Sequence, residues 1–156
     1  MQIHTFAEEN ISSPKTEMIM NNKVLLATLA GGVVSYLLGW LIFGMALAEN
    51  TSMWGSATGI QKTEMGDMWA LILGNLTGAY LLAHIFSRWA GINTLEGGLK
   101  TGAFLGFLIW LTVDLIMFGT TNMYSLTGVG IDVAASTVMG AATGGIIGWV
   151  LGYKQK

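Results

Sequence analysis

Two acidic residues lie within or at the start of long apolar runs of the sequence. Asp114 is inside the run 99–118, and Asp132 is the second residue of the run 131–153. An ionised side chain in hydrocarbon costs about 2.5 to 3.5 kcal/mol on insertion scales, so each such residue is a functional candidate. Two carboxyl groups that share a pocket of low dielectric constant hold a proton between them or bind a cation. We therefore predict a cation or proton pathway at Asp114 and Asp132, with Asn75 as a third polar group.

A structural interpretation of the same two acids stays open. Asp114 is near the end of its run, where it would reach water at the membrane surface. Asp132 would cap the N-terminus of a helix, where the helix dipole favours an anion. Tyr124, in the connection between the two runs, is a further polar group near both. In this interpretation the two acids have no role in transport.

Nothing else in the sequence combines residue types at catalytic or metal-binding spacing. The chain has no cysteine, and it contains no GxSxG, HExxH or Walker motif. His84 has no second histidine or cysteine at ligand spacing, so it is interpreted as an interfacial side chain. With Arg88, Glu96 and Lys100 it would form a polar cluster at one membrane surface. We therefore predict no catalytic residue, no metal site and no cofactor, and hence a protein that is not an enzyme.

The elements that must position these residues follow from the composition. Of 156 residues, 53% are hydrophobic and only 10% are charged, whereas soluble domains carry about 25% charged residues. A membrane span needs about 20 apolar residues, and four runs are long enough: 24–48, 68–86, 99–118 and 131–153. None of them alternates apolar and polar residues as barrel strands do. The predicted fold is all-α, a polytopic membrane protein whose residues 24–153 form a four-transmembrane-helix bundle.

The positive charges predict how the spans are oriented. Lysine and arginine in short connections stay on the cytoplasmic side of a membrane. Six of the seven basic residues would lie on one side, and Lys62 alone on the other: Lys15, Lys23, Arg88, Lys100, Lys154 and Lys156 make up the six. We therefore expect an N-terminal arm, residues 1–23, and a tail, residues 154–156, in the cytoplasm. The connections 49–67 and 119–130 would then lie outside.

Two further features of the ends of the chain bear on this arrangement. Ala46, Leu47 and Ala48 match a signal-peptide cleavage pattern, but the apolar run before them is much longer than the 7 to 15 residues of a signal core. The first span is therefore expected to stay in the membrane. The arm 1–23 is polar with scattered apolar residues, and we expect it to lie on the membrane surface or against another protein.

Small residues recur at every fourth position in each predicted span. Such rows let two helix backbones approach closely in a bilayer. The glycines that these rows place at helix contacts are Gly31 and Gly39 in the first span, Gly74 and Gly78 in the second, Gly102 and Gly106 in the third, and Gly140, Gly144, Gly148 and Gly152 in the fourth. Packing within one chain and packing between copies both explain the rows, and the pattern alone leaves both open.

Four segments of the sequence carry a resemblance to a known group of proteins. They are YLLGWLIFG at 36–44, LILGNLTGAYLLAHIF at 71–86, GGLKTGAFLGFLIWLTVDLIMFGTTNMYSL at 97–126 and GIDVAASTVMGAATGGIIGWVLG at 130–152. Over residues 24–152 the chain resembles small four-span membrane proteins of unknown function that are frequent in Bacteroidetes. The resemblance implies a four-span fold, and it implies no activity and no site residues.

The sequence therefore supports two functional hypotheses. The first is a non-enzymatic subunit of a bacterial inner membrane, which packs through its small-residue rows with copies of itself or with a larger membrane complex. The alternative is a small cation or proton channel or transporter that uses Asp114, Asp132 and Asn75. In both, the lipid bilayer is the main partner. A net charge of −2 provides no basic surface for a phosphate backbone, so no nucleic acid is expected to bind.

Overall fold

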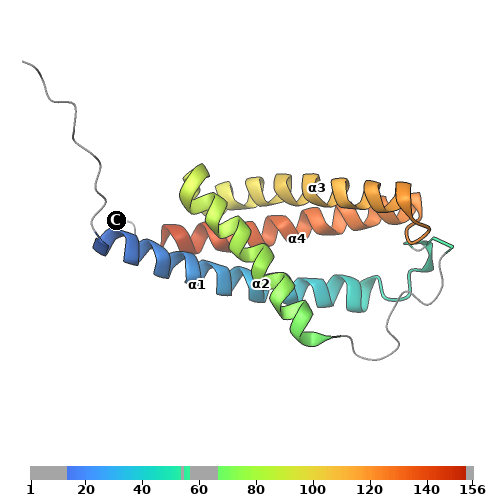
Figure 1. Cartoon of the computed structure of the whole chain (residues 1–156), viewed down its shortest axis with the longest axis horizontal. Helices are drawn as coiled ribbons and strands as arrows, with labels where there is room; N and C mark the ends of the chain where they lie inside the picture. Colours follow the sequence, from blue (N-terminus) through green and yellow to red (C-terminus); the bar gives the residue numbers. More distant parts are fainter. Residues whose placement is uncertain (1–13, 54, 57–66, 154–156) are drawn as a thin grey trace, which may run out of the picture.

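The computed structural model describes residues 14–53, 55–56 and 67–153. The described residues form helices and connecting loops, without a β-strand among them. Helix α1 (Pro14–Gly39) continues into a π-helical segment, η1 (Trp40–Ala46), and a short 3-10 turn follows, η2 (Thr51–Met53). Helix α2 (Met68–His84) also ends in a π-helical segment, η3 (Ile85–Ala90). Helices α3 (Leu95–Thr120) and α4 (Leu126–Gly152) complete the fold (Figure 1).

Four helical segments are long and apolar enough to cross a membrane. They are Asn22–Ala46, Met68–Ala90, Leu95–Thr120 and Leu126–Gly152, with 23 to 27 residues each. At 1.5 Å per residue they measure about 34 to 40 Å, which exceeds the roughly 30 Å of a hydrocarbon core. The all-α prediction with four potential spans is therefore confirmed. Large apolar side chains on each helix are exposed, such as Trp69 (67%), Phe104 (60%) and Val138 (59%), as expected of surfaces that contact lipid.

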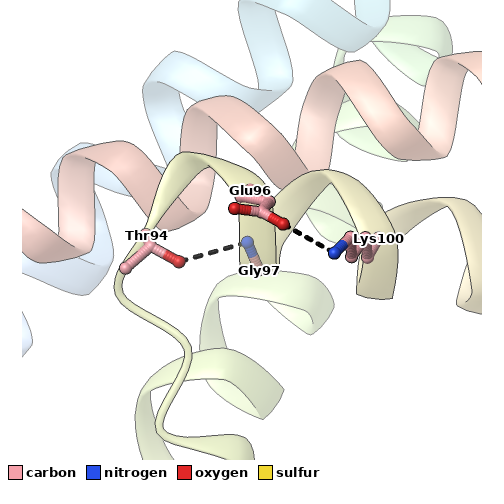
Figure 2. Close-up of polar contacts among 4 residues, drawn as sticks. All are labelled: Thr94, Glu96, Gly97 and Lys100. Carbon is pink, nitrogen blue, oxygen red and sulfur yellow. Dashed lines mark hydrogen bonds and ion pairs between the residues drawn. The ribbon is translucent and has the colours of Figure 1, made fainter.

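The helices α3 and α4 begin earlier than the apolar runs indicated. Helix α3 begins at Leu95 because Thr94 caps it: the Thr94 hydroxyl oxygen accepts a hydrogen bond from the Gly97 backbone N–H at 3.1 Å. Glu96 and Lys100 form an ion pair of 2.6 Å on its first turns (Figure 2). Helix α4 begins at Leu126 because the Ser125 hydroxyl accepts from Gly128 N–H at 2.9 Å. Hydropathy alone misses these turns because capping residues are polar.

The first two helices also differ from the predicted runs. Helix α1 begins at Pro14, so part of the expected arm is helical, whereas residues 1–13 and 154–156 lie outside the described residues. The second span continues through η3 and ends at Gly91, whose φ of 61° is in the left-handed region that glycine tolerates best. The Ile92 N–H donates to the Phe86 carbonyl across this end.

The helices are arranged around α4. Helices α3 and α4 form an antiparallel hairpin that packs along its length, and α1 lies beside α4. Helix α2 crosses obliquely over α1 and makes little contact with α3 (Figure 1). The start of α1 and the end of α4 meet at one end of the molecule, where Lys23 Nζ donates to the Tyr153 carbonyl oxygen at 3.2 Å.

The main apolar cluster lies at that end. It is made by α1, α2 with η3, and α4: Val24, Ala27, Ala79, Ala83, Phe86, Ile147 and Leu151. The C-terminal half of α2 belongs to this cluster, whereas its N-terminal half contacts α1, through Asn75 with Ser35 and Met68 with Tyr36. No buried side chain of α3 belongs to this cluster, so α3 is held mainly by α4.

Glycines hold the α3–α4 hairpin together. A Cβ atom on Gly102 would lie 2.9 Å from Gly144 Cα, and one on Gly148 would lie 3.1 Å from Gly98 Cα. Only glycine permits this backbone contact, and close approach is what stabilises helix pairs in lipid. The remaining glycines of the predicted rows in α3 and α4 contact the hairpin in the same way: Gly106 faces Gly140, and Gly152 faces the Asn93 carbonyl.

The glycine rows of the first two spans differ in whether they contact another helix of the chain. A Cβ on Gly31 would meet the Ile147 side chain at 2.7 Å, and one on Gly39 would meet Met139 Cε at 3.4 Å, so both glycines face α4. At Gly74 and Gly78 a Cβ would meet no described atom within 4 Å. The structure therefore does not place these two α2 glycines at a helix contact within the chain.

The end opposite the main apolar cluster is covered by residues 47–53 and 55–56. The Gly55 N–H donates to the Met123 carbonyl at 2.9 Å, and the Ser125 N–H donates to the Met53 carbonyl at 3.1 Å. The Ser125 hydroxyl also donates to the Ser52 carbonyl oxygen. Met53 is buried, with 3% of its surface exposed. These residues therefore lie against the turn between α3 and α4.

Candidate functional site

Asp114 and Asp132 face each other across the hairpin. Asp114 lies in the last two turns of α3 and Asp132 in the first two turns of α4. Both are about 9 Å along their helix axes from the connecting turn, at 1.5 Å per residue. An antiparallel hairpin brings such positions opposite each other. The two carboxyl groups form a side-chain hydrogen bond, and their residues are only 1% and 6% exposed.

The hydrogen bond determines the minimum number of protons on this carboxyl pair, Asp114–Asp132. An ionised carboxylate can only accept hydrogen bonds, so two carboxyl groups that are bonded to each other hold at least one proton. The Oδ2 atom of each aspartate is buried and has no hydrogen-bond partner among the described residues. A buried polar atom without a partner costs about 1 to 3 kcal/mol. The pair therefore presents two acceptor oxygens that a proton, a donor or a cation would satisfy.

Tyr124, in the connecting turn, interacts electrostatically with the carboxyl pair. It is partly buried, and this burial raises the pKa of its phenol. The negative charges of Asp132 and then of Asp114 raise the pKa of Tyr124 further. The phenol therefore stays neutral over the physiological range, and it lies within electrostatic reach of both acids.

A groove of about 470 Å³ lies between α2 on one side and the α3–α4 hairpin on the other. Asp132 lies on its wall and is the one acidic or basic side chain among the described residues that line it. Most of the wall is glycine, alanine or larger apolar residues, with the aromatic side chains of Phe43 and Trp110. Gly74 and Gly78 line it from α2, which explains why a Cβ there would meet nothing.

Asn75 lines the same groove but does not bond the carboxyl pair in any described contact. The Ser35 hydroxyl donates to Asn75 Oδ1 at 2.6 Å, and Asn75 Nδ2 donates to the Leu71 carbonyl at 2.8 Å. Asn75 therefore joins α2 to α1. Ser35 was absent from the predicted site, although its position between Gly31 and Gly39 placed it on the same face of the first span. Its partner could not be read from the sequence.

The structural interpretation of the two acids is wrong in both parts. Ser125, not Asp132, is the N-cap of α4. Asp114 does not reach the surface through its own helix end, since it is the most buried ionisable residue among those described. The correction for Asp132 arises because α4 begins before the apolar run, which places Asp132 inside the helix.

The polar cluster predicted at the other end is only partly formed. Glu96 pairs with Lys100 on the exposed surface of α3. His84 instead lies against two aromatic rings, those of Tyr80 and Trp89, each with its centroid 5.7 Å from the imidazole. Across the described residues, no three His, Cys, Asp or Glu side chains gather as a metal site would require.

These features define an all-helical chain with four potential spans, a buried carboxyl pair and a groove beside it. No family model, no curated protein and no solved structure matches the chain. Its function is therefore inferred from the geometry of the site.

Proposed function

We propose that this chain is an integral membrane protein that carries protons or small cations across the bilayer, with Asp114 and Asp132 as the carrier site. One observation carries the proposal: two carboxyl groups bond each other inside an apolar hairpin and leave both Oδ2 atoms without a partner. Buried polar atoms in a purely structural network normally have partners. Two such oxygens on neighbouring acids are acceptors that a proton or a cation would satisfy. We assign the chain no enzymatic reaction.

The surroundings of the pair support a route on one side only. The groove reaches Asp132 from the α2 side. Residues 47–53 and 55–56 lie against the connecting turn at the other side. A site with one open and one covered approach is what a carrier needs, because simultaneous openings on both sides would dissipate a gradient.

The charges at the two ends support an orientation. Lys23, Arg88 and Lys100 all lie at the end where α1 begins. By the positive-inside rule we place this end in the cytoplasm of a bacterium and the carboxyl pair in the outer half of the inner membrane.

The test is proton flux into liposomes. The purified chain would be reconstituted with an internal pH-sensitive dye, and a potassium gradient with valinomycin would drive protons inward. We expect flux above that of empty liposomes, and loss of this flux in Asp114→Asn and in Asp132→Asn. Glu49→Gln, an exposed acid at the same end, is the matched control and should keep the flux. Flux equal to that of empty liposomes, or flux unchanged in both aspartate variants, would overturn the proposal.

A second candidate function, a subunit of a homo-oligomer, rests on a different observation. Gly74 and Gly78 form a small-residue row on α2 that meets nothing within the described chain, and such rows fit the helix of a neighbour. We expect Gly78→Leu to convert a dimer into a monomer in lipid nanodiscs, measured by native mass spectrometry. Gly119→Leu, at a glycine that also has no neighbour within 4 Å, is the control. A wild-type chain that is monomeric at all concentrations would contradict this candidate.

A further inference from the structure

We propose that the groove between α2 and the α3–α4 hairpin binds a lipophilic monovalent cation, such as an organic ammonium or phosphonium ion, against Asp132. This inference rests on the proposed carrier function and names the class of its substrate. The protein would then exchange an organic cation for a proton at the carboxyl pair.

The size of the groove favours an organic ion over a metal ion. Its volume of about 470 Å³ is within the roughly 300 to 1,000 Å³ of small-molecule sites. A metal ion such as Ca²⁺ or Mg²⁺ needs about six oxygens that converge on one point. The side-chain oxygens of the groove wall are instead spread along it: Asp132 and Thr143 are about 16 Å apart along α4 at 1.5 Å per residue.

The lining of the groove favours a single positive charge on an apolar body. Asp132 supplies the one negative charge among the described residues of the wall, and its Oδ2 is buried without a hydrogen-bond partner. Phe43 and Trp110 line the same groove, and aromatic ring faces attract organic cations. Glycine backbone and leucine side chains make up much of the remaining surface. An organic monocation satisfies the acid, the rings and the apolar wall together.

The route into the groove suits an ion that dissolves in lipid. Helix α2 makes little contact with α3. The residues that line the groove from these two helices include four glycines beside the larger apolar side chains: Gly74 and Gly78 on α2, and Gly102 and Gly106 on α3. A lipophilic cation in the bilayer would therefore enter sideways between α2 and α3.

Charge balance links binding to proton release. A net charge in a medium of low dielectric constant is costly, so without a cation the pair has the lowest cost when it is neutral, with a proton on each carboxyl group. Binding of one monocation keeps the site neutral only if one proton leaves. The groups that titrate near Asp132 are Asp114 from α3 and Tyr124 from the connecting turn. The described groove residues of α1 and α2 contribute no ionisable side chain.

The test uses tetraphenylphosphonium as the probe and tetraphenylborate, an anion of the same size and shape, as its control. Binding to the full chain in a neutral detergent would be measured by equilibrium dialysis. We expect saturable binding of one phosphonium ion per chain, and at least about tenfold weaker binding of the borate. Phosphonium affinity should fall by about tenfold for each pH unit of acidification while one proton is exchanged. Equal binding of both ions, or binding that does not saturate, would overturn the inference.

Variants locate the site. Asp132→Asn should weaken phosphonium binding by at least about tenfold and abolish its pH dependence. Trp110→Leu should weaken it by several fold, whereas Trp149→Leu, at an exposed tryptophan outside the groove, should not. If Asp132→Asn does not fold, the Trp110 and Trp149 comparison still decides the matter. Equal affinities in these two tryptophan variants would overturn the inference. If phosphonium does not bind while the proton flux still depends on both aspartates, this inference fails and the carrier function stands.

Discussion

At the scale of single residues, the carboxyl pair combines two unfavourable features that the rest of the site does not remove. Asp114 and Asp132 are both buried, and each keeps an oxygen without a hydrogen-bond partner among the described residues. Only their mutual hydrogen bond offsets this cost. Tyr124 is the nearest reporter of the charge on the pair, because the charges of both aspartates act on its phenol.

Asp132→Asn is expected to lower the pKa of Tyr124 towards the ordinary tyrosine value of 10.0. The substitution removes the carboxylate whose charge has the larger effect on this pKa, and the effect of burial remains. The measurement is a titration of tyrosinate absorbance, in which Tyr124→Phe identifies the component that ionises last. A last component that is unchanged in Asp132→Asn would contradict this assignment.

The raised pKa of Tyr124 also makes the stability of the folded chain depend on pH. Because the pKa of Tyr124 is raised in the folded chain, the folded state holds this proton more tightly than the unfolded state. Its contribution to the free energy of unfolding is fully present below pH 10 and is lost as the pH rises through the folded pKa. The wild-type chain should therefore lose more stability above pH 10 than Tyr124→Phe does.

At the scale of elements, the α3–α4 hairpin depends on backbone contact rather than on side-chain packing. The apolar core joins α1, α2 and α4 at one end, and α3 is attached through glycines that face glycines. Dispersion between closely spaced backbones is the main attraction available to helices in lipid. The carboxyl pair therefore owes its geometry to this glycine contact, since both aspartates are on the two helices it joins.

Gly102→Ala is expected to destabilise the chain by about 1 to 3 kcal/mol, the usual cost of overpacking. The new methyl group would lie 2.9 Å from Gly144 Cα, and backbone atoms must move to admit it. Gly119→Ala, on the same helix with nothing within 4 Å, is the control. It should be neutral or stabilise by about 0.5 to 1 kcal/mol, because alanine favours helix over glycine. The measurement is unfolding in mixed micelles of increasing sodium dodecyl sulfate content. Equal effects of the two substitutions would contradict backbone contact at Gly102.

At the scale of the whole molecule, the two ends differ in the residues that they contain. The end with the start of α1 holds the apolar core and the basic residues Lys23, Arg88 and Lys100. The opposite end holds the carboxyl pair and the covering residues 47–53 and 55–56. Helix α2 joins the two, because its C-terminal half belongs to the core and its N-terminal half forms one wall of the groove.

Accessibility labelling tests the proposed orientation directly, because the chain has no cysteine. Single variants Glu49→Cys and Asn122→Cys place a thiol at the end with the carboxyl pair, and Glu96→Cys places one at the basic end. In intact bacterial cells, a membrane-impermeant maleimide should label the first two and not the third. After the cells are broken, all three should react. Labelling of Glu96→Cys in intact cells would reverse the orientation, and equal labelling of all three would exclude a membrane-spanning arrangement.

Parts of the site could be predicted from the sequence because they depend on local composition. Asp114 stands out as a charge within an apolar run, and Asp132 lies opposite it whenever the two runs form a hairpin. The role of Asn75 could not be predicted, because its bond to Ser35 depends on how α1 and α2 cross. The two α2 glycines were equally ambiguous: a row at every fourth position looks the same whether it packs on a helix or lines a groove.

The sequence by itself determined that this chain forms four long apolar helices, because the transfer of a segment into lipid depends on the hydropathy of that segment alone. It also determined which small residues share a helix face, since the helical repeat is a local property. Only the tertiary structure decided that the glycines of α3 and α4 meet each other while those of α2 remain open, and that Ser125 rather than Asp132 caps α4. The physical reason is that crossing angles and the exact ends of helices result from contacts between distant parts of the chain, and no single segment contains those contacts.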